Sequence, residues 1–153
     1  LADRAVDEAL DLFGGCVMAS HSNARALLGM SQRHLRDDHA KQIAERGGVV
    51  GLNLFGRFLA EGRTATIDDV RRHLDHWREW IGVEHLGLGS DFDGGFTPLD
   101  CPRGAQRPED LQQLLDGLRT CGWSEREVRA FAGESWIGFL RRALGGEGAM
   151  SSA

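Results

Sequence analysis

Two carboxylates stand two positions apart, at Asp91 and Asp93, in the glycine-rich stretch 87–95. The apolar residues before them predict a buried strand over residues 84–90 that ends at Asp91. Acids at the C-terminal end of such a strand lie where α/β folds carry catalytic groups. The neighbouring glycines let the backbone approach Asp91 closely and partly exclude water from it, and such surroundings can change the proton affinity of a carboxylate. The alternative is a turn in which both acids only hydrogen-bond loop amides.

A histidine and an amide follow two further apolar runs. Residues 16–20 predict a short buried strand that ends at His21, and residues 49–55 predict a second strand that carries Asn53. Because the C-terminal ends of parallel strands meet at one edge, His21, Asn53 and Asp91 are expected to converge there. This set suits a metal-assisted hydrolase, in which the imidazole binds the metal and the carboxylate moves a proton. A structural role for a single histidine is the alternative.

Arginines and a further histidine pair add candidate sites. Arg33, in the loop after the first predicted strand, could hold a substrate carboxylate, because a planar guanidinium matches its two oxygens. Arg25 and Arg36 have the same chemistry, and a surface position is the alternative for all three. His73 and His76 lie three positions apart on a predicted helix, but their charged neighbours favour a solvated face over a metal pair.

The elements that would position these groups alternate between helix and strand. Helices are predicted over residues 3–13 and 38–46 from apolar spacing and glycine stops, and over 108–121 from Pro108 onward. Capping patterns predict further helices that begin at Thr66 and Ser124, and a last helix has the apolar side Trp136, Phe139, Leu140 and Leu144. The alternation predicts an α/β fold with about three parallel strands, too few for a closed barrel.

Composition bounds the class of protein. The 153 residues suit one domain, over 1–144, followed by a disordered tail over 145–153. A net charge of -5 argues against a nucleic-acid partner, and the sequence has no segment apolar enough to span a membrane. The three cysteines, without any Cys-x-x-Cys, indicate neither a disulfide framework nor a thiolate zinc site, and they favour a reducing, cytoplasmic compartment.

Three motifs stand in order along the chain: ASHSNARAL at 19–27, QIAERGGVVG at 42–51 and GLGSDFDG at 87–94. Together they resemble the membrane (renal) dipeptidase family of zinc peptidases, and the resemblance extends to about Leu144. It implies a (β/α)8 TIM barrel, of which this chain would be the C-terminal part with the sixth to eighth strands. It also implies two zinc ions bridged by a glutamate and a water or hydroxide.

The resemblance also implies roles for individual residues. His21 would be a zinc ligand, Arg33 would bind the C-terminal carboxylate of a dipeptide, and Asp91 would be the proton-transferring acid. Asn53 is expected to contact the substrate. Asp93 is expected to shape the loop or to hold the residues that contact the metal or substrate.

The family's other metal ligands would lie before Leu1, so the isolated chain is expected to be inactive. The implied partners are a dipeptide substrate, the N-terminal half of the barrel and, as a further assembly, a second copy in a homodimer. Two other functions stay open. One is a non-catalytic binding module derived from the barrel, and the other is an amidohydrolase that acts on a non-peptide amide or a lactone.

Overall fold

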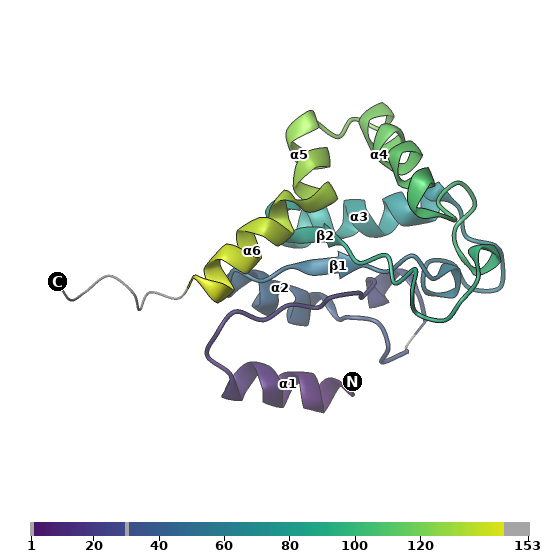
Figure 1. Ribbon diagram of the computed structural model, residues 1–153. Coiled ribbons are helices and arrows are strands. Elements are labelled where there is room, and N and C mark those ends of the chain that lie inside the picture. The colour runs from purple at the N-terminus through teal and green to yellow at the C-terminus, as the bar shows by residue number, and fades with distance from the viewer. Residues whose placement is uncertain (1, 30, 146–153) are drawn as a thin grey trace.

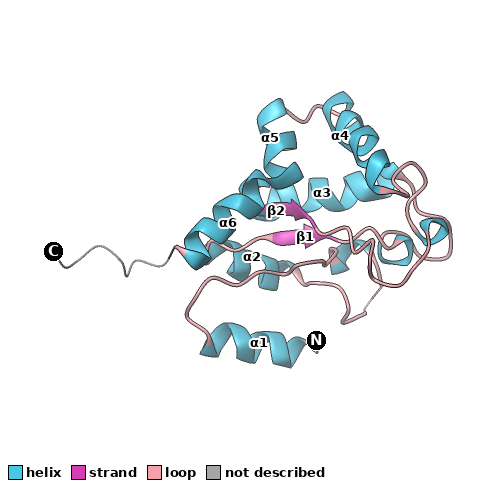
Figure 2. Ribbon diagram, viewed as in Figure 1, coloured by secondary structure: helices cyan, strands magenta, loops and turns pink. Residues whose placement is uncertain are grey.

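The computed structural model describes residues 2–29 and 31–145 (Figure 1). The helices and strands within these residues (Figure 2) are α1 (Asp3–Leu12), α2 (Asp37–Glu45), β1 (Val50–Leu52), α3 (Ile67–Ile81), β2 (Leu86–Leu88), α4 (Leu111–Thr120), α5 (Glu125–Arg129) and α6 (Ser135–Leu144). Short helical turns occupy Arg25–Leu27, Gly56–Phe58, Val83–His85, Pro98–Asp100 and Pro108–Asp110, and a π-helix covers Ala130–Glu134. The predicted tail, apart from Gly145, falls outside the described residues.

The two strands pair in parallel, with Val50 opposite Leu86, Gly51 opposite Gly87 and Leu52 opposite Leu88. In Figure 1, α2 and α3 lie behind the strands and α6 crosses in front of them. The strand side chains Val50, Leu52 and Leu86 join one buried core with helix residues that include Trp77 and Phe131. The result is an α/β fold with helices on both faces of a small parallel sheet.

On the opposite face of the sheet the strands present glycine, and the indole ring of Trp136 covers their backbone. A Cβ on Gly87 would stand 2.2 Å from Trp136 Nε1, and one on Gly51 would stand 2.9 Å from Trp136 Cζ2. The indole N–H donates to the Leu88 carbonyl at 3.0 Å. Glycine at these two paired positions therefore lets α6 lie close against the strands.

The predicted first strand is only partly formed, which corrects the expectation of about three strands. Residues 16–20 run parallel to β1 but make a single bridge, Ala19 opposite Val50. The bonds that hold them are Ala19 N to Val49 O at 3.0 Å, Gly51 N to Ala19 O at 2.8 Å and Ser22 N to Gly51 O at 2.7 Å. The segment therefore lies beside β1, on the side opposite β2, without forming a full strand.

Helices α3 and α5 begin after residues that cap them. The predicted capping boxes at Thr66 and Ser124 are confirmed, with Asp69 and Glu127 as their acidic partners. The apolar side predicted for the last helix is wrong in part. Phe139 is 5% exposed, but Leu140 and Leu144 are 46% and 80% exposed, because α6 turns the side with Trp136 toward the sheet.

Candidate active site

Asp91 follows β2 in a strained turn. Its φ of 60° lies in the left-handed region, which few residues other than glycine, asparagine and aspartate adopt. Gly94 N donates to the Asp91 carbonyl at 2.8 Å and closes the turn. A Cβ on Gly94 would stand 2.5 Å from Asp91 Oδ1, so the turn folds tightly over the carboxylate. The side chain is thereby held at the C-terminal end of the strand and stays half-buried.

Asn53 follows β1 and holds Asp91 directly. Its Nδ2 donates to Asp91 Oδ2 at 2.8 Å, and its Oδ1 accepts the backbone N–H of Phe55 at 2.6 Å. Asn53 is fully buried. The backbones of the two strand ends are joined by Gly89 N to Leu52 O at 3.0 Å. The expected approach of Asn53 and Asp91 is therefore present.

Asn23 is a buried residue of the site that the sequence reasoning missed. Its Oδ1 accepts Asn53 N at 2.9 Å, and its Nδ2 donates to Asn53 O at 3.1 Å and to Phe58 O at 2.6 Å. Asn23 is 1% exposed, and every one of these bonds is to backbone. Its position two residues after a predicted strand end was the available signal, since a polar side chain there can bond across to the next strand.

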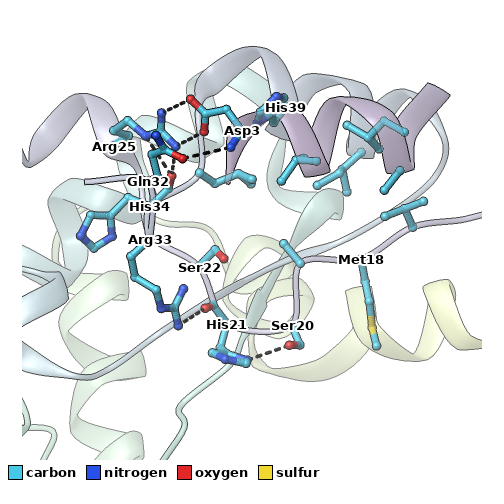
Figure 3. A pocket seen from close by; sticks show the side chains of 17 residues that line it. Asp3, Met18, Ser20, His21, Ser22, Arg25, Gln32, Arg33, His34 and His39 are labelled. Carbon is cyan, nitrogen blue, oxygen red and sulfur yellow. Dashed lines mark hydrogen bonds and ion pairs between the residues drawn. The ribbon is translucent and has the colours of Figure 1, made fainter. Parts of the chain in front are cut away.

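His21 lies at the same edge of the sheet. A Cβ on Gly89 would stand 3.1 Å from the His21 Cα and 2.1 Å from the Ser20 carbonyl oxygen, so the segment with His21 crosses directly over the end of β2. The imidazole is exposed, and its Nδ1 lies 2.7 Å from Ser20 Oγ (Figure 3). That contact orients the ring and leaves Nε2 for another partner.

Arg33 lies beside His21, and both line a cavity of about 450 Å³ (Figure 3). Its guanidinium donates to the His21 carbonyl at 3.1 Å and lies 4.7 Å from the centre of the Phe58 ring. Arg25 forms an ion pair with Asp3 at 2.6 Å, and Arg36 pairs with Asp38. No acidic side chain of the described residues pairs with Arg33, so among the three predicted arginines it is the one with charge to offer a ligand.

The cavity is lined by polar and apolar side chains. His21, Arg33 and Ser20 line one part of the cavity, and α1 and α2 contribute both polar side chains, Asp3 and His39, and apolar ones such as Val6 and Ile43. Asp93 does not line the cavity and is exposed in the loop beyond Asp91. The described residues contain no group of three or more His, Cys, Asp or Glu side chains that could hold a metal ion.

His73 and His76 do not form the solvated face that was expected, and this prediction is wrong. His73 is fully buried, and its Nδ1 accepts the Ala24 N–H at 3.2 Å. Burial lowers the pKa of His73 to about 4, so the ring is neutral. His76 Nε2 lies 2.8 Å from Asp37 Oδ1 and joins α3 to α2. The flanking charges misled because they sit on other sides of the same helix.

Comparison with known proteins gives consistent matches. A family model described as membrane dipeptidase (peptidase family M19) matches residues 1–143. An uncharacterized dipeptidase of Schizosaccharomyces pombe is 36% identical over 118 residues, which are 76% of this chain and 27% of that protein.

None of the helices in the described residues is long and apolar enough to cross a membrane.

Two solved structures are similar to this one. Dipeptidase AC, a metallopeptidase of family M19, superposes with a TM-score of 0.87 at 36% identity, over 95% of this chain and 43% of its own. A metallopeptidase from Rhodobacter sphaeroides, solved with a phosphinate mimic of the dipeptide L-Ala-D-Ala, gives 0.85 at 36% identity, over 94% and 40%. This chain therefore spans less than half the length of each of these relatives.

Proposed function

The chain belongs to the membrane dipeptidase family, and we propose that it supplies part of the active site of a zinc-dependent dipeptidase. The observation that carries the proposal is the meeting of His21, Asn53 and Asp91 at one edge of the parallel sheet, with Arg33 beside them. The catalytic groups of (β/α)8 barrels lie at this edge. The fold proposed for the whole protein is such a barrel, with this chain as its C-terminal part.

Of the residues in this chain, His21 is suited to supply one of the zinc ligands. The exposed His21 ring is fixed through Nδ1 by Ser20 Oγ, the arrangement that prepares the second ring nitrogen to bind a metal. The remaining ligands are proposed to come from residues outside this chain, because the described residues hold no group of three or more metal-binding side chains. Bound zinc would lower the pKa of water toward neutrality and polarise the scissile carbonyl.

Asp91 is proposed to carry the proton in peptide hydrolysis. It would accept a proton from the attacking water as the new C–O bond forms, and would deliver that proton to the amine nitrogen as the C–N bond breaks. Arg33 would bind the free carboxylate at the C-terminus of the substrate, which matches its lack of an acidic partner among the described residues. Asp93 would shape the loop, in keeping with its exposure.

The test is dipeptide hydrolysis by the full-length protein that carries this chain. L-Ala-D-Ala is the first substrate to try, because a relative has been solved with a mimic of it. We expect turnover that is lost after chelation, restored by zinc, and reduced at least about 1,000-fold in Asp91→Asn. The isolated 153-residue chain should be inactive with or without zinc.

Two results would overturn this proposal. Hydrolysis that persists in the isolated chain would show that its own residues suffice. Hydrolysis of a non-peptide amide or a lactone in place of any dipeptide would show that the substrate class is wrong, while leaving the site in place.

A further inference from the structure

Asn23 and Asn53 are the only asparagines in the sequence, and both are buried at the candidate site. They form a chain of contacts that ends on Asp91, since Asn23 holds the backbone of Asn53 and the Asn53 amide holds Asp91 Oδ2. Because this inference rests on the proposed function, it concerns the residue assigned there to proton transfer. We propose that Asn23 and Asn53 are positioning residues for the Asp91 carboxylate.

The orientation of each amide is fixed by its partners. Asn53 Oδ1 accepts the Phe55 N–H, so turning this amide over would place its oxygen against the Asp91 carboxylate and its NH2 against a donor. Asn23 has an acceptor occupied by Asn53 N and donors directed at two carbonyls, so turning it over would lose all three bonds. Each amide can therefore bond in one orientation only.

The contact separates the two oxygens of Asp91. Oδ2 accepts from Asn53 Nδ2 at 2.8 Å in a part-buried position. That bond fixes the rotation of the carboxylate and leaves Oδ1 to receive and release the proton. A hydrogen bond to a carboxylate oxygen is stronger in such surroundings than in water, so this contact holds the orientation of the group firmly.

Asn23 does not contact Asp91 itself; it positions the carboxylate indirectly, by holding the backbone of Asn53. The bonds from Asn23 replace a strand ladder at the point where β1 has ended, and they also include the Phe58 carbonyl. The ring of Phe58 lies under Arg33, so the same amide anchors the backbone of the residue on which the proposed carboxylate-binding arginine rests. Asn23 thus connects the proton-transfer side of the site with the substrate-binding side.

This role differs from the substrate contact expected for Asn53. The side chain is fully buried, and its acceptor and its donor group already have protein partners. Because none of the side chain is exposed, a substrate would have to displace the groups that cover Asn53 to reach it. Asn53 therefore orients the group that reacts and does not touch the substrate itself.

The decisive variant is Asn53→Asp in the full-length protein. It keeps an oxygen for the Phe55 N–H, removes the donor to Asp91 and adds a negative charge beside it. We expect kcat to fall about 10- to 100-fold, with KM changed less than about twofold, as is usual for residues that orient a reacting group. Asn23→Ser should lower kcat in the same way but less.

The matched control is Glu79→Gln, an exposed side chain on α3, which should leave kcat and KM unchanged. A merely structural role for Asn53 predicts less folded protein but an unchanged kcat per folded molecule. That outcome would overturn the proposal.

A second measurement does not depend on activity. With asparagine labelled by nitrogen-15, this chain gives two side-chain amide groups in an NMR spectrum. The Asn53 amide signals should shift as the neighbouring carboxylate is titrated, and the shift should vanish in Asp91→Asn. If the Asn53 signals respond neither to the titration nor to the Asp91→Asn substitution, the positioning role is overturned. If the wild-type protein hydrolyses no dipeptide but the signals respond, the proposed function fails and the contact stands.

Discussion

Asp91 combines the proton-transfer role proposed for it with an unfavourable backbone conformation. It is the only residue other than glycine with a positive φ in the parts of the chain that the structure describes. The Gly94 N–H bond and the Asn53 amide hold it there. Strain that is held by several contacts is typical of residues whose placement matters to function.

Substitutions at Asp91 should separate strain from charge. We expect Asp91→Ala to be less stable than Asp91→Asn by about 1 kcal/mol, because asparagine accepts a left-handed backbone more readily than alanine. Urea unfolding at pH 7 measures the difference. The same two substitutions at the exposed Asp93, which has no positive φ, should differ little. Equal stability for the two Asp91 variants would contradict the strained conformation.

Arg33 offers a test that separates substrate binding from folding. Arg33→Lys in the full-length protein should raise KM for a dipeptide about 10-fold or more with little change in kcat, because a bidentate contact to the carboxylate is lost. A dipeptide amide, which lacks that carboxylate, should be hydrolysed equally by both forms. A matching loss with the amide would show that Arg33 acts on something other than the substrate carboxylate.

At the scale of elements, close approach of backbones decides where glycine is required. A Cβ on Gly89 would stand 2.1 Å from the Ser20 carbonyl oxygen, which is backbone and cannot move aside. Gly89→Ala should therefore destabilise the protein by about 1–3 kcal/mol, as overpacking does. Gly14→Ala, where nothing lies within 4 Å of the new Cβ, is the control and should be close to neutral. Thermal unfolding of both variants makes the comparison, and equal melting temperatures would refute it.

The sequence predicted most elements to within a residue or two, because amphipathic spacing and caps are local signals. Helix α3 begins after Thr66 and ends at Ile81, as its capping box and Gly82 indicated. Pairing is not local, so the partial formation of residues 16–20 could not be predicted. The site shows the same division. His21, Asn53 and Asp91 could be placed at strand ends, but the bond from Asn23 across to Asn53 depends on tertiary packing.

At the scale of the whole molecule, the buried His73 makes stability depend on pH. Its pKa is lowered to about 4 by burial, so the unfolded chain takes up a proton at a higher pH than the folded one. The stabilisation is complete above about pH 6.5 and is lost as pH falls toward 4. The slope in this window is about 1.4 kcal/mol per pH unit.

Unfolding in urea at pH 7 and pH 5 measures this effect. The free energy of unfolding should fall between the two values in the wild type and fall less in His73→Asn, whose side-chain oxygen can still accept the Ala24 N–H. Asp69, whose pKa is held low mainly by Arg63, contributes at more acidic pH and does not confuse the comparison. Identical pH dependence in the variant would show that His73 is not the group responsible.

The span of the asparagine bonds has a kinetic consequence. Asn23 and Asn53 are 30 positions apart, and Asn53 and Asp91 are 38 apart, so each bond closes a long loop. Local helices form in microseconds, whereas contacts between distant segments wait for loop closure and collapse. The helices can therefore fold before the site exists, and the Asp91 carboxylate acquires its orientation only when three distant segments have docked. Assembly of the site is a late event in folding, and a nascent chain acquires it only after residue 91 has been synthesised and packed.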